Sequence, residues 1–302
     1  MGLESELTAI VGKDNLLTKE VLAAHTTFRV GGPCRYFITP RTADECGDVV
    51  RLLKKNSVPY MILGNGSNIL VSDKGYDGAV ICTAKHMHRI TVSGSRITAD
   101  AGAMLPKVAS EALAHSLSGL EFAAGIPGSI GGACIMNAGA YGGEMKDVIC
   151  KATAICPDGE VRSFSPNDIQ AGYRHTVFLT GDYVVLSVEL SLKEGDCEAI
   201  RGAMEGYTAA RREKQPLEYP SAGSTFKRPS GDYAGRLIEA SGLKGRGIGD
   251  ACVSDKHAGF VINKGNATAD DIYRTIMMVK DEVMRNSGIE LECEVRMFGD
   301  FA

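Results

Sequence analysis

The sequence predicts a mixed α+β protein in which strands pair locally and a separate lobe follows. Apolar residues alternate along short runs joined by turn residues, as at Ile90–Ala99 and on either side of Pro157–Gly159. Strands outnumber helices over the first 194 residues, which disfavours the regular alternation of a doubly wound sheet. After Glu194 the composition changes to charged helices and polar loops. We therefore expect residues from about 195 to 291 to form a second compact part.

Composition excludes several classes of protein. A chain of 302 residues can form one large domain or two to three small ones. Its net charge of −4 gives no basic surplus for nucleic acid, and no apolar run approaches the length of a membrane span. Acidic residues stand near the start, where a signal peptide needs basic ones. We expect a cytoplasmic protein that binds neither nucleic acid nor a membrane.

The nine cysteines form no recognisable framework. Their number is odd and they are scattered without any CxxC pair, which fits neither a disulfide scaffold nor a zinc site. We expect most to be small buried hydrophobes. His86 and His88 could face one metal from a strand, but no third ligand is near, so a surface pair and no metal are expected.

The first half of the chain contains clear element boundaries. Thr26–Thr39 predicts a strand, a Gly-Gly-Pro turn and a second strand. Thr42 and Glu45 form a capping-box pattern that opens a helix. Pro106 stands at the start of another helix, which Gly119 ends. Short apolar runs predict strands at Tyr60–Leu63 and Ile69–Val71, and the turn at Pro157–Gly159 predicts a hairpin of Lys151–Ile155 with Val161–Phe164. A long alternating pattern predicts a strand at Tyr183–Leu192.

The second part is richer in helix. A charged helix is predicted over Glu194–Lys214, and a second one, capped by Asp232, runs through Ala240. Thr268 and Asp271 cap a third helix that Gly288 ends. The remaining strands are predicted at Phe260–Asn263 and Glu290–Met297.

A glycine-rich stretch dominates the middle of the chain. Residues 119–143 read GLEFAAGIPGSIGGACIMNAGAYGG and carry apolar residues that flexible linkers lack. Glycine costs more backbone entropy to order than any other residue, so this many indicate a close approach to a ligand or repeated turns. Successive free N–H groups in such a loop can hold a phosphate. We expect a phosphate-bearing cofactor here; tight turns between core strands are the alternative.

A second loop, Gly64–Asn68, separates two short predicted strands. Its sequence, GNGSN, is not a dinucleotide fingerprint, because that motif needs a third glycine and a helix directly after it. Its N–H groups could still bind pyrophosphate in a backbone nest. A simple hairpin turn explains the pattern equally well.

Three positions present reactive groups without an obvious structural role. Arg174 lies in a polar loop, where a guanidinium could bind a carboxylate or an enolate. Ser224 follows Gly223 in a second loop, and its hydroxyl could donate a proton. Glu294 is on the charged side of the last predicted strand. Solvated charges and a turn residue are the plainer interpretations, and the residues alone do not pair the three.

Six motifs occur in order: TTFRVGG (26–32), LGNGSN (63–68), GIPGSIGGACIMNAGAYG (125–142), GYRHTVF (172–178), AGSTFKRP (222–229) and ECEVRMFG (292–299). Together they resemble the UDP-N-acetylenolpyruvoylglucosamine reductases (UDP-N-acetylmuramate dehydrogenases), flavoenzymes of bacterial cell-wall synthesis. The resemblance covers almost the whole chain.

The resemblance implies an architecture. Two FAD-binding subdomains of the PCMH type (FAD-binding type 2) would take residues 1–83 with 292–302 and residues 84–194. A UDP-sugar-binding domain would take residues 195–291. The family also has a longer form with an inserted Tyr-bearing loop. Only the predicted helix before Lys214 fills that place here, so the chain looks like the shorter form.

The resemblance also implies a reaction of peptidoglycan precursor synthesis, on which cell shape and division depend. NADPH would give a hydride to N5 of non-covalently bound FAD, which passes it to the methylene carbon of UDP-N-acetylglucosamine enolpyruvate. Protonation of the adjacent carbon by Ser224 would yield UDP-N-acetylmuramate. Arg174 and Glu294 match the residues that stabilise the enolate. Glu294 would have to be protonated, and burial raises a carboxyl pKa in that direction.

The same match assigns binding residues, and the protein is expected to act as a monomer. The implied cofactor-binding residues are Gly64, Asn65, Gly66, Ser67, Asn68, Gly125, Ile126, Pro127, Gly128, Ser129, Gly131, Gly132, Asn137, Gly139 and Ala140. The implied substrate-binding residues are Tyr173, Lys227 and Arg228.

Two other functions remain open from the sequence. A different FAD oxidoreductase, such as an oxidase of alcohols or sugars, could share the binding half but would usually have a larger substrate domain and often covalent flavin. A non-catalytic nucleotide-binding or scaffold protein fits the glycine loops and leaves Arg174, Ser224 and Glu294 unexplained.

Overall fold

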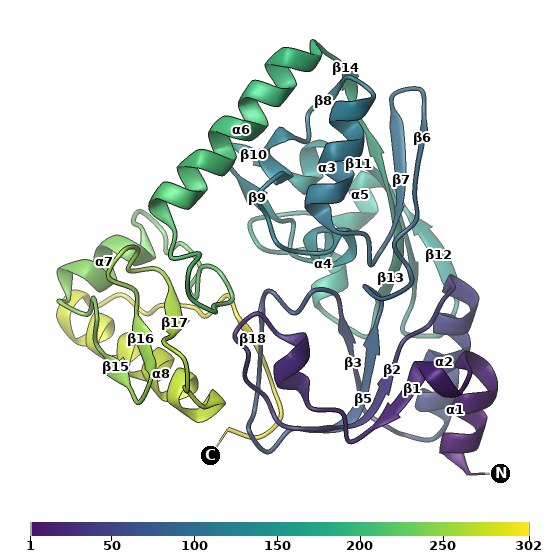
Figure 1. Cartoon of the computed structure of the whole chain (residues 1–302), viewed down its shortest axis with the longest axis horizontal. Helices are drawn as coiled ribbons and strands as arrows, with labels where there is room; N and C mark the ends of the chain where they lie inside the picture. Colours follow the sequence, from purple (N-terminus) through teal and green to yellow (C-terminus); the bar gives the residue numbers. More distant parts are fainter. Residues whose placement is uncertain (1, 302) are drawn as a thin grey trace. The chain divides into compact units, whose positions relative to one another are not determined.

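The computed structural model describes residues 2–301, which divide into two compact units (Figure 1). The first unit takes residues 2–18, 36–65 and 78–211, and the second takes 19–35, 66–77 and 212–301. Each unit mixes helices and strands and has a hydrophobic core of its own. The predicted α+β class is therefore confirmed.

The larger sheet of the first unit has five antiparallel strands. Its order is β12 (Val161–Phe164), β11 (Ile149–Ile155), β13 (Val184–Ser191), β7 (Arg96–Asp100) and β6 (Ile90–Ser93). Both predicted hairpins are present. Helices α3 (Leu105–Ala114) and α4 (Ile130–Ile135) contribute to the same core as this sheet (Figure 1). Helix α4, which lies within the glycine-rich stretch, is thus packed into the core of this sheet.

A smaller sheet carries the first loop of interest. Its order is β1 (Leu16–Thr18), β2 (Cys34–Ile38), β5 (Tyr76–Cys82) and β3 (Tyr60–Leu63). β3 runs parallel to β5 and ends directly before Gly64. Helices α1 (Leu3–Val11) and α2 (Ala43–Lys55) share its core. The Thr42 side chain caps α2 by accepting a hydrogen bond from the N–H of Glu45, as predicted.

The second unit is built around two helices and a three-stranded sheet. β15 (Gly247–Ile248), β16 (Ala251–Val253) and β17 (Val261–Asn263) are antiparallel. They share a core with α7 (Ala234–Ala240) and α8 (Ala269–Ser287). The capping box of Thr268 and Asp271 is complete, and Gly288 ends α8 with a φ of 68°. In the same unit β18 (Arg296–Phe298) runs parallel to β4 (Ile69–Val71).

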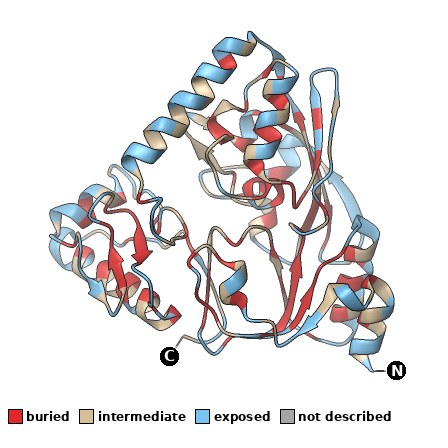
Figure 2. Ribbon diagram, viewed as in Figure 1, coloured by how far each residue is buried: buried red, intermediate tan, exposed pale blue. Residues whose placement is uncertain are grey.

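Helix α6 and several shorter elements complete the described chain. Helix α6 (Cys197–Lys214) is long but buries only Ile200 fully, and Figure 2 shows it largely exposed or intermediate. None of the helices within residues 2–301 is long and apolar enough to cross a membrane. The remaining elements are α5 (Pro166–Ile169), β8 (Leu117–Ser118), β14 (Lys193–Glu194), β9 (Gly139–Ala140), β10 (Gly143–Glu144) and 3₁₀ turns at Lys13–Asn15, Leu22–His25, Glu121–Ala123, Met145–Asp147 and Val177–Leu179.

Five sequence-based expectations were wrong. Helix α3 ends at Ala114, with His115 as its C-cap, and not at Gly119. The N-cap of α7 is Tyr233, not Asp232. Thr26–Val30 is a turn, because the Thr26 hydroxyl donates to the Val30 carbonyl and Arg29 has a φ of 58°. The last strand is shorter than expected, because residues 292–294 bond to a loop rather than to a strand. The glycine-rich stretch is also less loop-like than expected, since it contains α4 and the β9–β10 hairpin.

Glu189 on β13 joins three strands of the large sheet. It accepts a hydrogen bond from Arg96 on β7 and lies 2.7 Å from Lys151 Nζ on β11. Its side chain is only 12% exposed. The Lys151 and Arg96 hydrogen bonds lower the pKa of Glu189 to about 2.

This pKa predicts a loss of stability in acid. A carboxyl whose pKa is lower in the folded state stabilises the fold above its unfolded pKa, and that contribution disappears as the pH falls toward the folded pKa. The Glu189 contribution should thus be lost between about pH 4.5 and 2. In the Glu189→Gln variant the melting temperature should fall less steeply as the pH is lowered. Glu160→Gln, which changes an exposed side chain, is the control and should show the same acid slope as the parent. Identical acid slopes for parent and Glu189→Gln would show that this network does not stabilise the fold.

Candidate active site and cofactor cradle

Two of the predicted loops touch each other in the first unit. A Cβ atom on Gly64 would lie 2.2 Å from Ser129 Oγ, so the approach requires glycine at position 64. Asn65 Nδ2 donates a hydrogen bond to the Pro127 carbonyl at 2.6 Å. Ser129 Oγ also accepts a hydrogen bond from the N–H of Gly132 at the start of α4, at 3.4 Å. The structure therefore brings the end of β3 and the glycine-rich stretch together, as the sequence predicted.

Both loops present backbone N–H groups without partners. Within residues 2–301, the N–H groups of Asn65, Gly66, Ser67 and Asn68 donate no hydrogen bond, and neither do those of Gly128 and Ser129. Gly66 and Ser129 are buried. Buried N–H groups nearly always have a partner, and successive unpaired ones form concavities that bind anions. Asn65, Gly128 and Ser129 of the first unit therefore present donors of the kind that a phosphate-bearing ligand needs, and Gly66, Ser67 and Asn68 of the second unit present others.

A cation that the sequence reading missed lies against the same stretch. The Cδ atom of Arg211, on α6, would be 3.1 Å from a Cβ on Gly125. Burial lowers the pKa of Arg211, whereas Tyr141 raises it. Within residues 2–301 the guanidinium makes no hydrogen bond and no ion pair. A half-buried guanidinium without an anion beside it would be stabilised by hydrogen bonds to an acidic group of a ligand.

α6 also touches the other end of the stretch. Tyr207 stacks on Tyr141 with ring centroids 4.6 Å apart and an interplanar angle of 5°. Residues four apart lie on one face of a helix, so Tyr207 and Arg211 point to the same side. Helix α6 thus contacts the glycine-rich stretch at two points.

At several of the predicted cofactor-binding positions, close packing within the protein already requires glycine. The N–H of Gly131 donates to the Ala101 carbonyl at 2.9 Å, and a Cβ there would lie 2.8 Å from Ala101 Cβ. A Cβ on Gly139 would lie 2.6 Å from the Gly143 carbonyl oxygen. Close packing explains these glycines without a ligand. Contact with the cofactor stays a prediction for Ile126, Gly131, Gly132, Gly139 and Ala140.

The predicted catalytic residues fall into both units. Arg174 belongs to the first unit, in a turn closed by hydrogen bonds between Gly172 and His175, and its guanidinium lies 5.0 Å from the Tyr173 ring centroid. Ser224 and Glu294 belong to the second unit. There the Glu294 N–H donates to the Thr225 carbonyl at 2.8 Å, and Phe226 pairs with Cys293. The structure therefore brings Ser224 and Glu294 onto neighbouring segments.

Asn68 fixes the Glu294 segment. Its Nδ2 donates to the Glu294 carbonyl at 3.0 Å, and its own carbonyl accepts from the Arg296 N–H at 3.0 Å. The GNGSN loop thus reaches a predicted catalytic residue through backbone contacts. Sequence reasoning had assigned Asn68 to the cofactor only.

The predicted substrate-binding residues of the second unit have protein partners. Lys227 is ion-paired with Glu292, and the Arg228 guanidinium lies 4.6 Å from the Tyr233 ring centroid. Lys227 is therefore partly neutralised before any substrate binds. Its contact with substrate, like that of Tyr173 and Arg228, stays a prediction.

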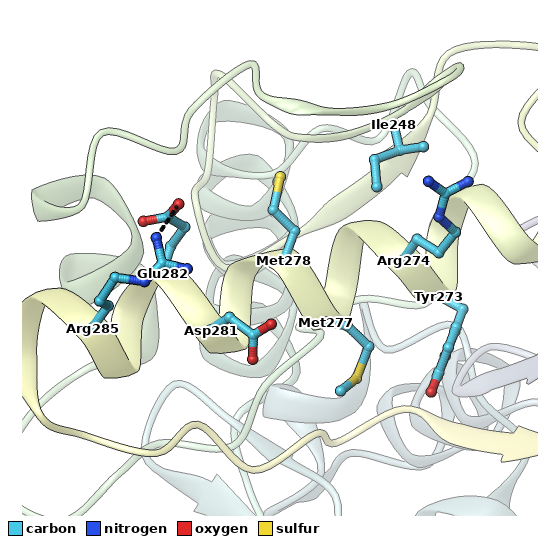
Figure 3. Close-up of a pocket in the computed structure, with 8 residues that line it drawn as sticks. All are labelled: Ile248, Tyr273, Arg274, Met277, Met278, Asp281, Glu282 and Arg285. Carbon is cyan, nitrogen blue, oxygen red and sulfur yellow. Dashed lines mark hydrogen bonds and ion pairs between the residues drawn. The ribbon is translucent and has the colours of Figure 1, made fainter.

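Other surface features carry no part of this site. A hollow of about 340 Å³ lies along α8 and is lined by side chains such as Tyr273, Arg274 and Arg285 (Figure 3). None of the predicted site residues lines it. No cluster of three or more metal-ligating side chains occurs among residues 2–301, and His86 bonds to the Asn15 side chain instead.

Comparisons with known proteins agree with this geometry. One family model, an FAD binding domain, matches residues 34–165. A second, the C-terminal domain of UDP-N-acetylenolpyruvoylglucosamine reductase, matches residues 215–298. Two curated proteins with this enzyme's name are 46% and 47% identical to the chain. The one from Clostridium novyi (strain NT) covers 99% of this chain and 97% of its own, and that from Clostridium kluyveri (strain NBRC 12016) covers 98% and 97%.

Solved structures give the same result. The crystal structure of UDP-N-acetylenolpyruvylglucosamine reductase from Thermus caldophilus is 36% identical, with a TM-score of 0.81 over 93% of this chain and 98% of that chain. The chain belongs to the UDP-N-acetylenolpyruvoylglucosamine reductase family. A glucose dehydrogenase, Phl p 4.0202, shares only the fold, at 17% identity and a TM-score of 0.53 over 65% of this chain and 44% of that chain.

Membership of the reductase family confirms the resemblance read from the motifs. The protein is an FAD-binding oxidoreductase of peptidoglycan precursor synthesis that uses NADPH. Its residues fit the cofactor, because FAD carries a pyrophosphate and Asn65, Gly128 and Ser129 of the first unit offer unpaired N–H groups that can donate to phosphate oxygens. No Lys is needed in either loop for this kind of anion binding.

The contact between Gly64 and Ser129 predicts the behaviour of a small substitution. Gly64→Ala forces a methyl group onto Ser129 Oγ, and such overpacking typically costs about 1–3 kcal/mol. We expect a lower melting temperature and less FAD retained through gel filtration. Adding Ser129→Ala should restore part of both, because it removes the clashing oxygen. Gly202→Ala, in an open position of α6, serves as the control. A Gly64→Ala protein with full FAD and unchanged stability would contradict this packing.

Proposed function

We propose that the protein reduces UDP-N-acetylglucosamine enolpyruvate to UDP-N-acetylmuramate with NADPH, using Arg174, Ser224 and Glu294 as catalytic residues. The observation that carries the proposal is the pair of loops with unpaired N–H groups, at 65–68 and 128–129, in a member of this reductase family. When bound, FAD takes a hydride from NADPH and gives it to the enolpyruvyl double bond.

Asn65, Gly128, Ser129 and Arg211, all in the first unit, would hold phosphate oxygens of the cofactor. Backbone N–H groups donate to phosphate oxygens without the bulk of a side chain. Arg211 adds a positive charge beside Gly125. Glycine at 64 lets the two loops approach closely, and the family resemblance implies that FAD is bound non-covalently.

Ser224 would protonate the substrate carbon next to the carboxylate. Its side chain is exposed, on a loop whose neighbour Thr225 is fully buried. The Thr225 N–H donates to the Gly259 carbonyl at 2.8 Å, and its hydroxyl accepts from the Val261 N–H at 3.0 Å. This anchoring holds the backbone beside Ser224 in place, which favours a general acid at this position.

Arg174 and Glu294 would stabilise the negative charge that develops on the substrate. A guanidinium can bind a carboxylate with two parallel hydrogen bonds. Glu294 can contribute only in its protonated form, as a donor to the developing oxyanion. Asn68 and Thr225 hold the Glu294 backbone from two sides.

We also propose the finer assignments that the family resemblance implies. Residues 1–83 with 292–302 and residues 84–194 would bind FAD, and residues 195–291 would bind the UDP-sugar, with Tyr173, Lys227 and Arg228 contacting it. The protein would act as a monomer in the cytoplasm. Its nine cysteines are all free thiols, which fits a reducing compartment.

Ser224→Ala separates the two half-reactions. It should leave FAD binding and reduction by NADPH unchanged, because Ser224 acts only on the enolpyruvyl substrate. Reoxidation by that substrate should slow about 10²–10⁴-fold, the usual cost of losing a general acid. Stopped-flow absorbance of the flavin measures both steps. A parallel fall in both half-reactions would refute the assigned role.

Arg211 and its neighbour Arg212 form a matched pair. Arg211→Met should weaken FAD binding about 10–100-fold, since a hydrogen bond to a charged group is worth about 1.5–3 kcal/mol. Arg212→Met changes an exposed side chain and should leave FAD binding unchanged. Fluorescence titration of the apoprotein with FAD gives both dissociation constants. Equal affinities for the two variants would mean that Arg211 does not contact the cofactor.

A further inference from the structure

The turn that carries Arg174 is fastened at both ends to residues at the end of α4. Asn137 Nδ2 donates to the Gly172 carbonyl at 2.9 Å, before the turn. Thr176 Oγ1 donates to the Ile135 carbonyl at 2.7 Å, after it. Arg174 itself has a φ of 51°, a conformation that a residue other than glycine keeps only where its surroundings fix it. These two hydrogen bonds are surroundings of that kind.

Asn137 is the centre of this attachment. Its side chain is buried, at 1% exposure, and its second amide hydrogen bonds to Glu144 Oε2 at 2.8 Å. Its Oδ1 accepts from the Lys146 N–H at 2.9 Å. Both donors and one acceptor site of the amide are therefore used by the protein. Such a side chain has no hydrogen left to donate to a cofactor.

Glu144 adds a charge to the network. Its carboxylate bonds to Asn137 and pairs with Lys146 Nζ at 3.0 Å. Burial by itself raises the pKa of Glu144, but hydrogen bonds from Lys146 and Asn137 and the charges of Lys146 and Arg174 lower it overall. Glu144 is thus ionised at neutral pH, and the Arg174 guanidinium lies within its electrostatic reach.

We propose that Asn137 and Glu144 are positioning residues for Arg174, holding the 172–175 turn so that the guanidinium meets the substrate carboxylate. The inference rests on the role given to Arg174 under the proposed function. It assigns Asn137 to the catalytic turn, whereas the sequence pattern had assigned it to the cofactor. Through this amide the glycine-rich stretch sets both the cofactor cradle and the cation that acts on the substrate.

Two variants test the inference on the FAD-loaded protein. Asn137→Gly removes the amide and tolerates the φ of 42° at this position. Glu144→Gln keeps the shape of the side chain and removes its charge. Both should keep bound FAD and its rate of reduction by NADPH, while reoxidation by the enolpyruvyl sugar slows about 10–100-fold through misplacement of Arg174. Val188→Ala, in the same core, controls for stability loss and should leave both half-reactions unchanged.

A double-mutant cycle with Arg174→Ala shows whether Asn137 acts through Arg174. In the Arg174→Ala background, Asn137→Gly should change reoxidation by less than about twofold, because the group it positions is gone. A further slowing equal to that in the parent would overturn the inference. So would a fall of FAD content or of the NADPH step in step with reoxidation, since that indicates a general structural role.

Arg174→Ala distinguishes a failure of the role proposed for Arg174 from a failure of the positioning role proposed for Asn137 and Glu144. If Arg174→Ala reoxidises as fast as the parent, the proposed role of Arg174 is wrong. If Arg174→Ala is slow while Asn137→Gly and Glu144→Gln match the parent, only the positioning inference is wrong.

Discussion

Buried backbone N–H groups must find acceptors, and in this protein two loops leave theirs unmet by the protein itself. Gly66 and Ser129 are buried, and their N–H groups have no partner within residues 2–301. Leaving such a group unsatisfied costs about 1–3 kcal/mol, so an acceptor supplied by a ligand would stabilise these loops. The proposed location of the cofactor site depends on this constraint.

The glycines serve two purposes that one sequence pattern does not separate. At Gly64 and Gly131 the missing side chain lets neighbouring backbone or Ser129 pack closely, with the closest atoms inside ordinary contact distance. Gly66 combines both purposes, because its N–H has no partner, its φ is 63° and a Cβ there would lie 2.1 Å from the His25 carbonyl oxygen. At Gly128 the free N–H is the useful feature. A glycine-rich stretch is therefore a packed structure rather than a flexible one, and α4 lies inside it.

Local signals in the sequence were sufficient for the elements whose stabilisation is local. The hairpins at β6–β7 and β11–β12 and the caps of α2 and α8 depend on turn and capping residues within a few positions, so they were predicted. The turn at Thr26–Val30 was not, because a side-chain hydrogen bond outweighed its β-like composition. The last strand was predicted too long because its first half pairs with a loop 65 or more residues away.

For the site residues too, the sequence shows what local signals determine and does not show what distant contacts determine. Motif resemblance identified the family and proposed the reactive groups, but contacts distant in sequence decide what each side chain touches. Arg211 and Tyr207 are ordinary surface residues of a charged helix until α6 meets the glycine-rich stretch. Asn137 and Glu144 carry no motif that links them to Arg174, 30 or more residues away. A pattern of Asn and Glu beside tight turns could have marked them as candidates, but not their partner.

The central claim is that side-chain-free loops bind FAD through their N–H groups, and the visible spectrum of the purified protein tests it most directly. The account predicts flavin absorbance, bleaching on addition of NADPH, return of colour with the enolpyruvyl sugar, and release of unmodified FAD on denaturation. A colourless protein that takes up no FAD when the cofactor is supplied would contradict it.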